Sequence, residues 1–272
     1  MITSPKTRIE DVFRPSGADA SIRLIAYLTA GDPSLDATGD LLAAVDRGGA
    51  DVIELGVPFS DPMADGVVIQ RASERALKSG ATLSKILSRL PQWLERVKAP
   101  VILFGYYNPI LQYGVERFAR DLARAGGQGA LVVDLSPEEA EPYVNAIRAE
   151  SLDTIFLASP TSTDERLARI APLSSGFLYL ISRPGVTGER ASVSLEIEPL
   201  VRRVRRFTKL PLAVGFGLSK PGQVRQVNSL ADAAVVGSAL VRAIEEHYAQ
   251  QGGAAIEEFV RRLKSGTGSE PE

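Results

Sequence analysis

Eight short apolar segments recur along the chain, and this repetition limits the fold more than any other feature of the sequence. Each segment is bounded by Gly, Pro or Asp, as buried parallel strands usually are. Stretches with helical periodicity separate the segments, so strand and helix alternate. The segments lie at residues 22–28, 51–55, 101–106, 129–135, 154–158, 177–181, 210–216 and 233–237. This alternation is typical of an α/β protein that folds as a (β/α)8 TIM barrel.

The chain of 272 residues is predicted to form one domain, 1–272, because no interdomain linker interrupts the pattern. The barrel should extend over about residues 8–265, with an extra N-terminal helix at Arg8–Phe13 and helical decorations after the second strand. The polar tail 266–272 is expected to be disordered. Ser136 is a candidate N-cap, with Pro137 at the first helical position. A doubly wound sheet is less well supported, since no GxGxxG turn follows the first strand.

Composition excludes several classes of function. The formal net charge of −2 argues against a nucleic-acid surface, and no apolar run approaches the about 20 residues that span a bilayer. The N-terminus lacks the apolar core of a signal peptide, and the chain has no Cys, so a cytoplasmic enzyme is expected. The single histidine, His247, lies in a polar helical stretch and is predicted to be solvated. No metal site is therefore expected.

The stretch IELGVPFSDPMADG, residues 53–66, places acids where catalysis occurs in such barrels. Glu54 is near the end of the second strand and Asp65 is in the loop that follows, at the carboxyl-end mouth of the barrel. Burial in an apolar mouth would raise the pKa of either carboxyl, which suits proton exchange near neutral pH. The pattern alone leaves another interpretation open, in which Glu54 pairs with Arg or Lys and Asp65 caps a helix.

Glycine-rich turns follow the sixth, seventh and eighth strands, in SRPGVTGER, GFGLSKPG and GSAL. Phosphate sites in these barrels combine the last loops with the N-terminus of a short helix, whose backbone N–H groups bind the anion. Gly217, Gly237 and Ser238 fit that role, with Gly188 approaching from the loop after the sixth strand. A single such turn would indicate only a turn, but three in this order favour a phosphate site.

Aromatic side chains stand near several strand ends. Tyr179 alternates with its neighbours in FLYLI and could bring a hydroxyl group to the mouth, although a buried structural tyrosine fits the pattern equally well. Other aromatic residues near strand ends are Tyr27, Phe104, Tyr106 and Phe216. Aromatic residues there usually pack together, so the pattern allows, without requiring, a flat aromatic ligand.

Five motifs together resemble the tryptophan synthase alpha chain family. They are ELGVPFSDPMADG followed by VVIQRA, LTAGDP after the first strand, YLISRPGVTGER, GFGLSKP and VVGSA. The resemblance extends from about Arg8 to Leu263. It implies a lyase that cleaves indole-3-glycerol phosphate by a retro-aldol reaction to indole and glyceraldehyde 3-phosphate.

The same resemblance implies the roles of individual residues. Glu54 would protonate the indole carbon and accept the hydroxyl proton, Asp65 would interact with the ring N–H, and Tyr179 would position the substrate. The phosphate would be bound by Gly188, Gly217, Gly237 and Ser238. The indole pocket would be formed by Tyr27, Ile69, Phe104, Tyr106 and Phe216. No metal or organic cofactor is implied in this chain.

Members of the family also bind a beta chain that carries pyridoxal phosphate, in an alpha2beta2 assembly that passes indole through a tunnel. The resemblance places Asp61, Arg183 and Thr187 in the loops that link this partner to closure of the site. Three positions depart from the usual family pattern: Val67-Val68 stands where many members have Pro-Thr or Pro-Val, Ser136-Pro137 where many have Pro-Pro or Val-Pro, and Tyr27 where Phe is commoner.

Three rival functions stay open on the sequence. A free-standing lyase that releases indole without a partner would keep the same catalytic residues. A non-catalytic barrel that regulates a partner would have no need of both carboxylates and all three phosphate turns. Another sugar-phosphate barrel, such as an isomerase, would not require the spacing between Glu54 and Asp65.

Overall fold

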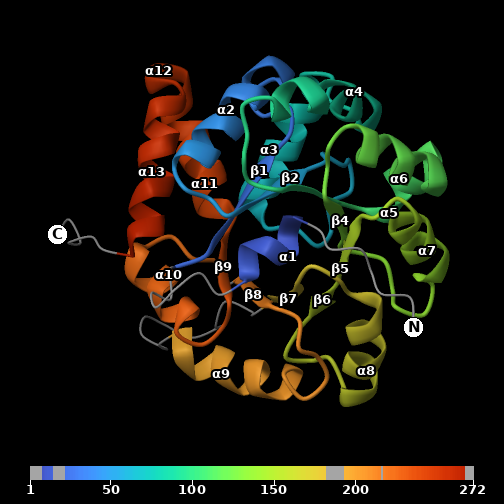
Figure 1. Cartoon of the computed structure of the whole chain (residues 1–272). Helices are drawn as coiled ribbons and strands as arrows, with labels where there is room; N and C mark the ends of the chain where they lie inside the picture. Colours follow the sequence, from blue (N-terminus) through green and yellow to red (C-terminus); the bar gives the residue numbers. More distant parts are fainter. Residues whose placement is uncertain (1–7, 15–21, 182–192, 216, 267–272) are drawn as a thin grey trace.

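Parallel strands pair around a common axis with helices outside them (Figure 1), as the alternating pattern predicts. The computed structural model describes residues 8–14, 22–181, 193–215 and 217–266. The strands are β1 (Leu24–Thr29), β2 (Val52–Gly56), β3 (Val101–Gly105), β4 (Gly129–Val132), β5 (Asp153–Ile155), β6 (Leu157–Ala158), β7 (Leu178–Ile181), β8 (Leu212–Gly215) and β9 (Ala233–Val236). All pairings are parallel, in the order β5-β4-β3-β2-β1-β9-β8-β7-β6.

The fifth predicted strand is divided in two. The end strands of the sheet order, β5 and β6, are separated in sequence only by Phe156. β5 pairs with β4 on one side, and β6 pairs with β7 on the other. The predicted segment 154–158 therefore bridges the two edges of the sheet, and the nine strands form a nearly closed (β/α)8 barrel.

Helices surround the strands, and their bounds follow the amphipathic stretches of the sequence. They are α1 (Arg8–Phe13), α2 (Leu35–Arg47), α3 (Val67–Lys78), α4 (Leu83–Leu94), α5 (Tyr107–Tyr113), α6 (Val115–Arg124), α7 (Glu141–Ala149), α8 (Asp164–Leu173), α9 (Val193–Val204), α10 (Pro221–Asn228), α11 (Ser238–Ala243), the π-helical turn η1 (Ile244–Tyr248), α12 (Ala249–Gln251) and α13 (Gly253–Ser265). In the described part of the chain, no helix combines the length and apolar character needed to cross a membrane.

The prediction that Ser136 caps a helix is wrong. Helix α7 begins only at Glu141, with Ala140 at its N-cap and Pro142 in its first turn. Ser136 instead starts a turn in which its carbonyl accepts a hydrogen bond from the Glu139 backbone N–H at 3.1 Å. The Ser136 hydroxyl donates to the Glu139 carboxylate at 3.0 Å. The second proline, five residues further on, provides the helix start that the first does not.

Two apolar layers result from the alternation of side chains along the strands. One layer fills the barrel and comprises Ile25, Val52, Ile102, Leu131, Ile155, Phe177, Ala213, Ala233 and Val235. The expected helix α1 is present and lies across the middle of the strand ring (Figure 1). Its Ile9 is fully buried in this inner layer, and its Phe13 ring lies 6.0 Å from that of Phe177. The outward side chains of the strands pack against the surrounding helices.

Candidate active site

Tyr27 and Glu54 stand side by side at the carboxyl end of the barrel. Parallel pairing places Tyr27 of β1 opposite Glu54 of β2, and Glu54 opposite Ile102 of β3. Ile25 and Val52, two residues earlier on their strands, belong to the inner layer. Because side chains alternate along a strand, Tyr27 and Glu54 also point inward, one layer nearer the mouth.

Glu54 is a buried acid in apolar surroundings. Its side chain is 1% exposed, and burial raises its pKa to about 8. Among the described residues, its Oε1 has no hydrogen-bond partner. The interpretation in which an Arg or Lys neutralises Glu54 thus receives no support from the described part of the chain. A carboxyl with this pKa is mostly protonated at pH 7 and can donate a proton into the mouth.

Asp65 is a second carboxyl in a different environment. Tyr106 donates a hydrogen bond to Asp65 Oδ2 at 3.1 Å, and the Ala64 backbone N–H donates to the Tyr106 hydroxyl at 3.0 Å. Burial raises the pKa of Asp65 to about 6, although the Tyr106 hydrogen bond acts in the opposite direction. The Gln70 side chain also donates to the Asp65 carbonyl at 2.8 Å, which ties the loop to α3.

Tyr106 has a contact that the sequence pattern does not reveal. Its aromatic ring is buried and stacks on Phe59, with ring centroids 5.0 Å apart, while its hydroxyl supports Asp65. The residue was predicted only as a wall of an aromatic pocket. The signal for its additional contact would have been its position one residue after β3, next to the loop that follows β2.

Two strand-end glycines make room for the two inward tyrosines, and sequence reasoning missed both. A Cβ added to Gly56 would lie 2.2 Å from the Tyr27 hydroxyl, and one added to Gly215 would lie 2.3 Å from the Tyr179 hydroxyl. Burial, followed by the charge of Glu54, raises the pKa of Tyr179 well above its usual value. The Tyr179 hydroxyl therefore stays protonated and able to donate a hydrogen bond at neutral pH. The signal was glycine as the last residue of β2 and β8.

A small apolar cluster with two aromatic rings packs beside these groups. The rings of Tyr27 and Phe104 meet edge to face with centroids 5.2 Å apart, and Ile69 of α3 packs against Tyr27. The structure thus brings together Tyr27, Ile69 and Phe104. Of the other predicted residues, Arg183, Thr187, Gly188 and Phe216 lie outside the described residues.

The predicted phosphate turn after the last strand adjoins this cluster. A Cβ added to Gly237 would lie 3.6 Å from Tyr27 Cβ and 3.8 Å from Ile69 Cδ1. Gly237 is the N-cap of α11, and the Val241 N–H donates to its carbonyl at 3.0 Å. Helical N–H groups before that first hydrogen bond, starting with that of Ser238, are free of intrahelical partners. Gly217 has a positive φ of +64°, a conformation that glycine adopts without strain.

Two further predicted residues lie at the surface. Asp61 is exposed, in the same loop as Met63, whose side chain is 90% exposed. His247, predicted to be solvated, has a side chain that is 48% exposed. No group of three or more His, Cys, Asp or Glu side chains suited to a metal ion occurs within the described ranges.

These features define a class: a (β/α)8 barrel with two carboxyls of raised pKa at its carboxyl-end mouth, beside an apolar cluster and a helix whose N-cap is glycine. The sequence profile of the tryptophan synthase alpha chain family matches residues 14–267. The tryptophan synthase alpha chain of Solibacter usitatus is 52% identical, over 97% of this chain and 99% of that protein. The alpha chain of Geotalea uraniireducens is 47% identical, over 96% and 97% respectively.

Solved structures agree with the sequence comparison. The alpha subunit of tryptophan synthase from Legionella pneumophila superposes with a TM-score of 0.88 at 37% identity, covering 96% of this chain and 98% of that one. Tryptophan synthase from M. tuberculosis, in an aminoacrylate-bound form, gives a TM-score of 0.85 at 36% identity, covering 96% and 99%. The chain belongs to the tryptophan synthase alpha chain family.

Proposed function

We propose that the chain cleaves indole-3-glycerol phosphate to indole and glyceraldehyde 3-phosphate. The observation that carries the proposal is the pair of carboxyls with different environments: Glu54, buried with a pKa of about 8, and Asp65, with a pKa of about 6. At pH 7 the first is mostly protonated and the second mostly ionised. Two carboxyls held in opposite protonation states can divide acid and base work.

The proton transfers follow from these states. Protonated Glu54 donates its proton to C3 of the indole ring, and Asp65 stabilises the positive charge that develops at the ring N–H. The Glu54 carboxylate then accepts the proton of the adjacent glycerol hydroxyl. The bond between C3 and the glycerol carbon breaks, its electrons return to the ring, and the glycerol carbon becomes the aldehyde. Glu54 ends protonated again, so side chains supply every proton and no metal or organic cofactor is needed.

The remaining groups bind and orient the substrate. Tyr27, Ile69 and Phe104 flank the space for a flat ring, with Tyr106 holding Asp65 and Tyr179 donating from the opposite side of the barrel. Backbone N–H groups at Gly237 and Ser238 bind the phosphate, with Gly217 and, from the loop after β7, Gly188. Remote phosphate binding holds the reacting carbon at the carboxyls, which lowers the entropic part of the barrier.

We further propose a beta chain carrying pyridoxal phosphate as the partner, in an alpha2beta2 assembly. The exposed loop with Asp61 and Met63, next to the site, supports a contact there. Arg183 and Thr187 would act in the same coupling.

The deciding experiment is an indole-release assay of the purified chain on indole-3-glycerol phosphate, alone and with an added beta chain. Turnover that rises strongly with the beta chain is expected. Full activity without it would favour a free-standing lyase, and no turnover under either condition would reject the proposed reaction.

A further inference from the structure

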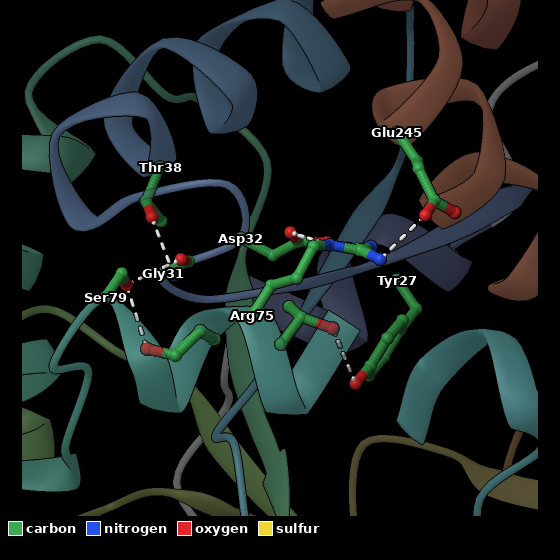
Figure 2. Close-up of polar contacts among 9 residues, drawn as sticks. Tyr27, Gly31, Asp32, Thr38, Arg75, Ser79 and Glu245 are labelled. Atoms are coloured by element: carbon green, nitrogen blue, oxygen red, sulfur yellow. Dashed lines mark hydrogen bonds and ion pairs between the residues drawn. The ribbon is translucent and has the colours of Figure 1, made fainter. Parts of the chain in front are cut away.

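An ion triad outside the reacting groups joins three elements of the site, as Figure 2 shows. Arg75 of α3 donates from Nε and Nη2 to the two carboxylate oxygens of Asp32, at 2.8 and 2.9 Å. Its Nη1 donates to Glu245 Oε1 of η1 at 2.8 Å. Asp32 follows β1, so a single guanidinium contacts the loop after β1, helix α3 and the turn that continues α11.

The two carboxylates differ in burial. The Asp32 side chain is 5% exposed, whereas that of Glu245 is 44% exposed. A buried carboxylate that loses its only cation is costly, while an exposed ion pair contributes little to stability. The Asp32 contact therefore supports folding, and the Glu245 contact needs another explanation.

The loop after β1 is fixed to α3 at a second point. Ser79 donates to the Gly31 carbonyl at 2.9 Å, and the Gly31 N–H donates to the Thr38 hydroxyl at 3.0 Å (Figure 2). A Cβ added to Gly31 would lie only 2.5 Å from that of Ala81. Hydrogen bonds and close packing thus join this loop to the end of α3.

The segment after α11 is held from two sides. Glu245 contacts Arg75, and the hydroxyl of Tyr248, at the end of the same π-helical turn, donates to Asp40 of α2 at 3.2 Å. π-helical turns often mark functional positions. Here the turn directly follows α11, the short helix whose N-cap is Gly237.

The elements that the triad joins also contribute a small apolar cluster at one side of the site. Ala72, one helical turn before Arg75, is fully buried against Tyr27 and Val241. Ile69 packs on the same cluster, and both Tyr27 and Ile69 approach Gly237. Any change in spacing between α3 and α11 would therefore separate the aromatic wall from the proposed phosphate turn.

We propose that Arg75 is a positioning residue. Through Asp32 and Glu245, its guanidinium holds α3 and the α11–η1 segment at a fixed spacing. That spacing keeps Tyr27 and Ile69 next to Gly237. This inference rests on the proposed lyase function. Arg75 touches none of the reacting groups, and acts only through the elements it joins.

The first test removes the negative charge of the exposed contact. Glu245→Gln is expected to raise both KM for indole-3-glycerol phosphate and Kd for glycerol 3-phosphate about threefold, because the ion pair between α3 and the α11–η1 segment is weakened. Its kcat and Tm should stay near those of the unaltered chain. The matched control is Arg47→Gln, which removes the 2.8 Å ion pair between Arg47 of α2 and Glu257 of α13. That control should change neither KM nor Kd.

The second test separates positioning from folding. Arg75→Met alone leaves the buried Asp32 carboxylate without its cation, so the double variant Arg75→Met/Asp32→Asn is the informative one, since it leaves no uncompensated buried charge. It is expected to fold and to lose at least about tenfold in kcat/KM. Arg75→Lys keeps a cation beside Asp32 and should recover most of the stability but only part of the activity, because an ammonium lacks the planar fork that binds both Asp32 oxygens and Glu245 together.

A folded double variant with the kcat, KM and glycerol 3-phosphate affinity of the unaltered chain would overturn the proposal. Turnover by the unaltered chain in the same assay tests the proposed function separately. If that turnover is absent, the lyase function fails, and the glycerol 3-phosphate affinities still decide whether Arg75 positions the phosphate turn.

Discussion

At the scale of single residues, the site depends on where each acid is placed relative to solvent. Glu54 is on a strand whose other residues are apolar, and nothing among the described residues compensates its charge. Asp65 is in a loop, keeps a hydrogen bond from Tyr106, and has the lower pKa of the two. Both groups are carboxyls, so the proposed division of acid and base roles depends on the difference between their pKa values.

Replacing Glu54 by Gln tests that role directly. The amide keeps the shape but cannot transfer a proton, so indole formation should fall by at least about a thousandfold while the Kd of glycerol 3-phosphate changes by less than about tenfold. Steady-state kinetics and calorimetry measure the two quantities. Near-normal turnover would remove Glu54 from the mechanism.

The pH dependence of kcat/KM should be bell-shaped. Activity is expected to rise as Asp65 ionises near pH 6 and to fall as Glu54 loses its proton near pH 8. Tyr106→Phe removes a hydrogen bond that lowers the pKa of Asp65, so the acidic limb should move to higher pH while the basic limb stays. Tyr107→Phe, at the next residue, is the control and should move neither limb. An unshifted acidic limb in Tyr106→Phe would contradict the assignment.

At the scale of elements, the start of α11 joins the strands to the proposed phosphate site. Gly237→Asp places a negative charge where an anion is expected, and its side chain would also approach Tyr27 and Ile69. The affinity for glycerol 3-phosphate should fall by at least about tenfold, through charge repulsion between like groups. Gly237→Ala, which adds only a methyl at contact distance, separates the effect of charge from that of size. Equal affinities for the Asp variant and the unaltered chain would exclude Gly237 from the site.

The strand pattern was predictable because its signal is local. Buried parallel strands need continuous apolar runs, and these runs predicted the barrel and the position of Glu54 near the end of the second strand, where an inward side chain enters the mouth. The break at Phe156, the late start of α7 and the π-helical turn depend on packing between distant segments. The hydrogen bond from Tyr106 to Asp65 links the segment after β3 to the loop after β2. The contact between Tyr179 and Gly215 links β7 to β8. Neither pair is close in sequence, so the local pattern around one residue does not identify its partner.

At the scale of the whole molecule, the buried acid makes stability depend on pH. The pKa of Glu54 rises from 4.5 to about 8 on folding, so the folded chain holds a proton that the unfolded chain has lost. Stability should therefore fall as pH rises between these values. Glu54→Gln removes this dependence, and its stability relative to the unaltered chain should increase between pH 5 and pH 8 by on the order of 4 kcal/mol.

Denaturant unfolding at the two pH values measures this difference. Glu95→Gln, at an exposed position after α4, is the control and should follow the unaltered chain at both. If the difference in unfolding free energy between Glu54→Gln and the unaltered chain is the same at both pH values, burial does not raise the pKa of Glu54.

The position of helix α1 determines through which end of the barrel a ligand can enter and leave. Ile9 is fully buried in the inner layer, so apolar side chains fill one end of the barrel, and the proposed chemistry is at the other end. Only the carboxyl end of the barrel is therefore left for a ligand, so a substrate would enter and its products would leave through the same mouth. A partner that receives a product directly would therefore bind at this mouth, where Asp61 and Met63 are exposed.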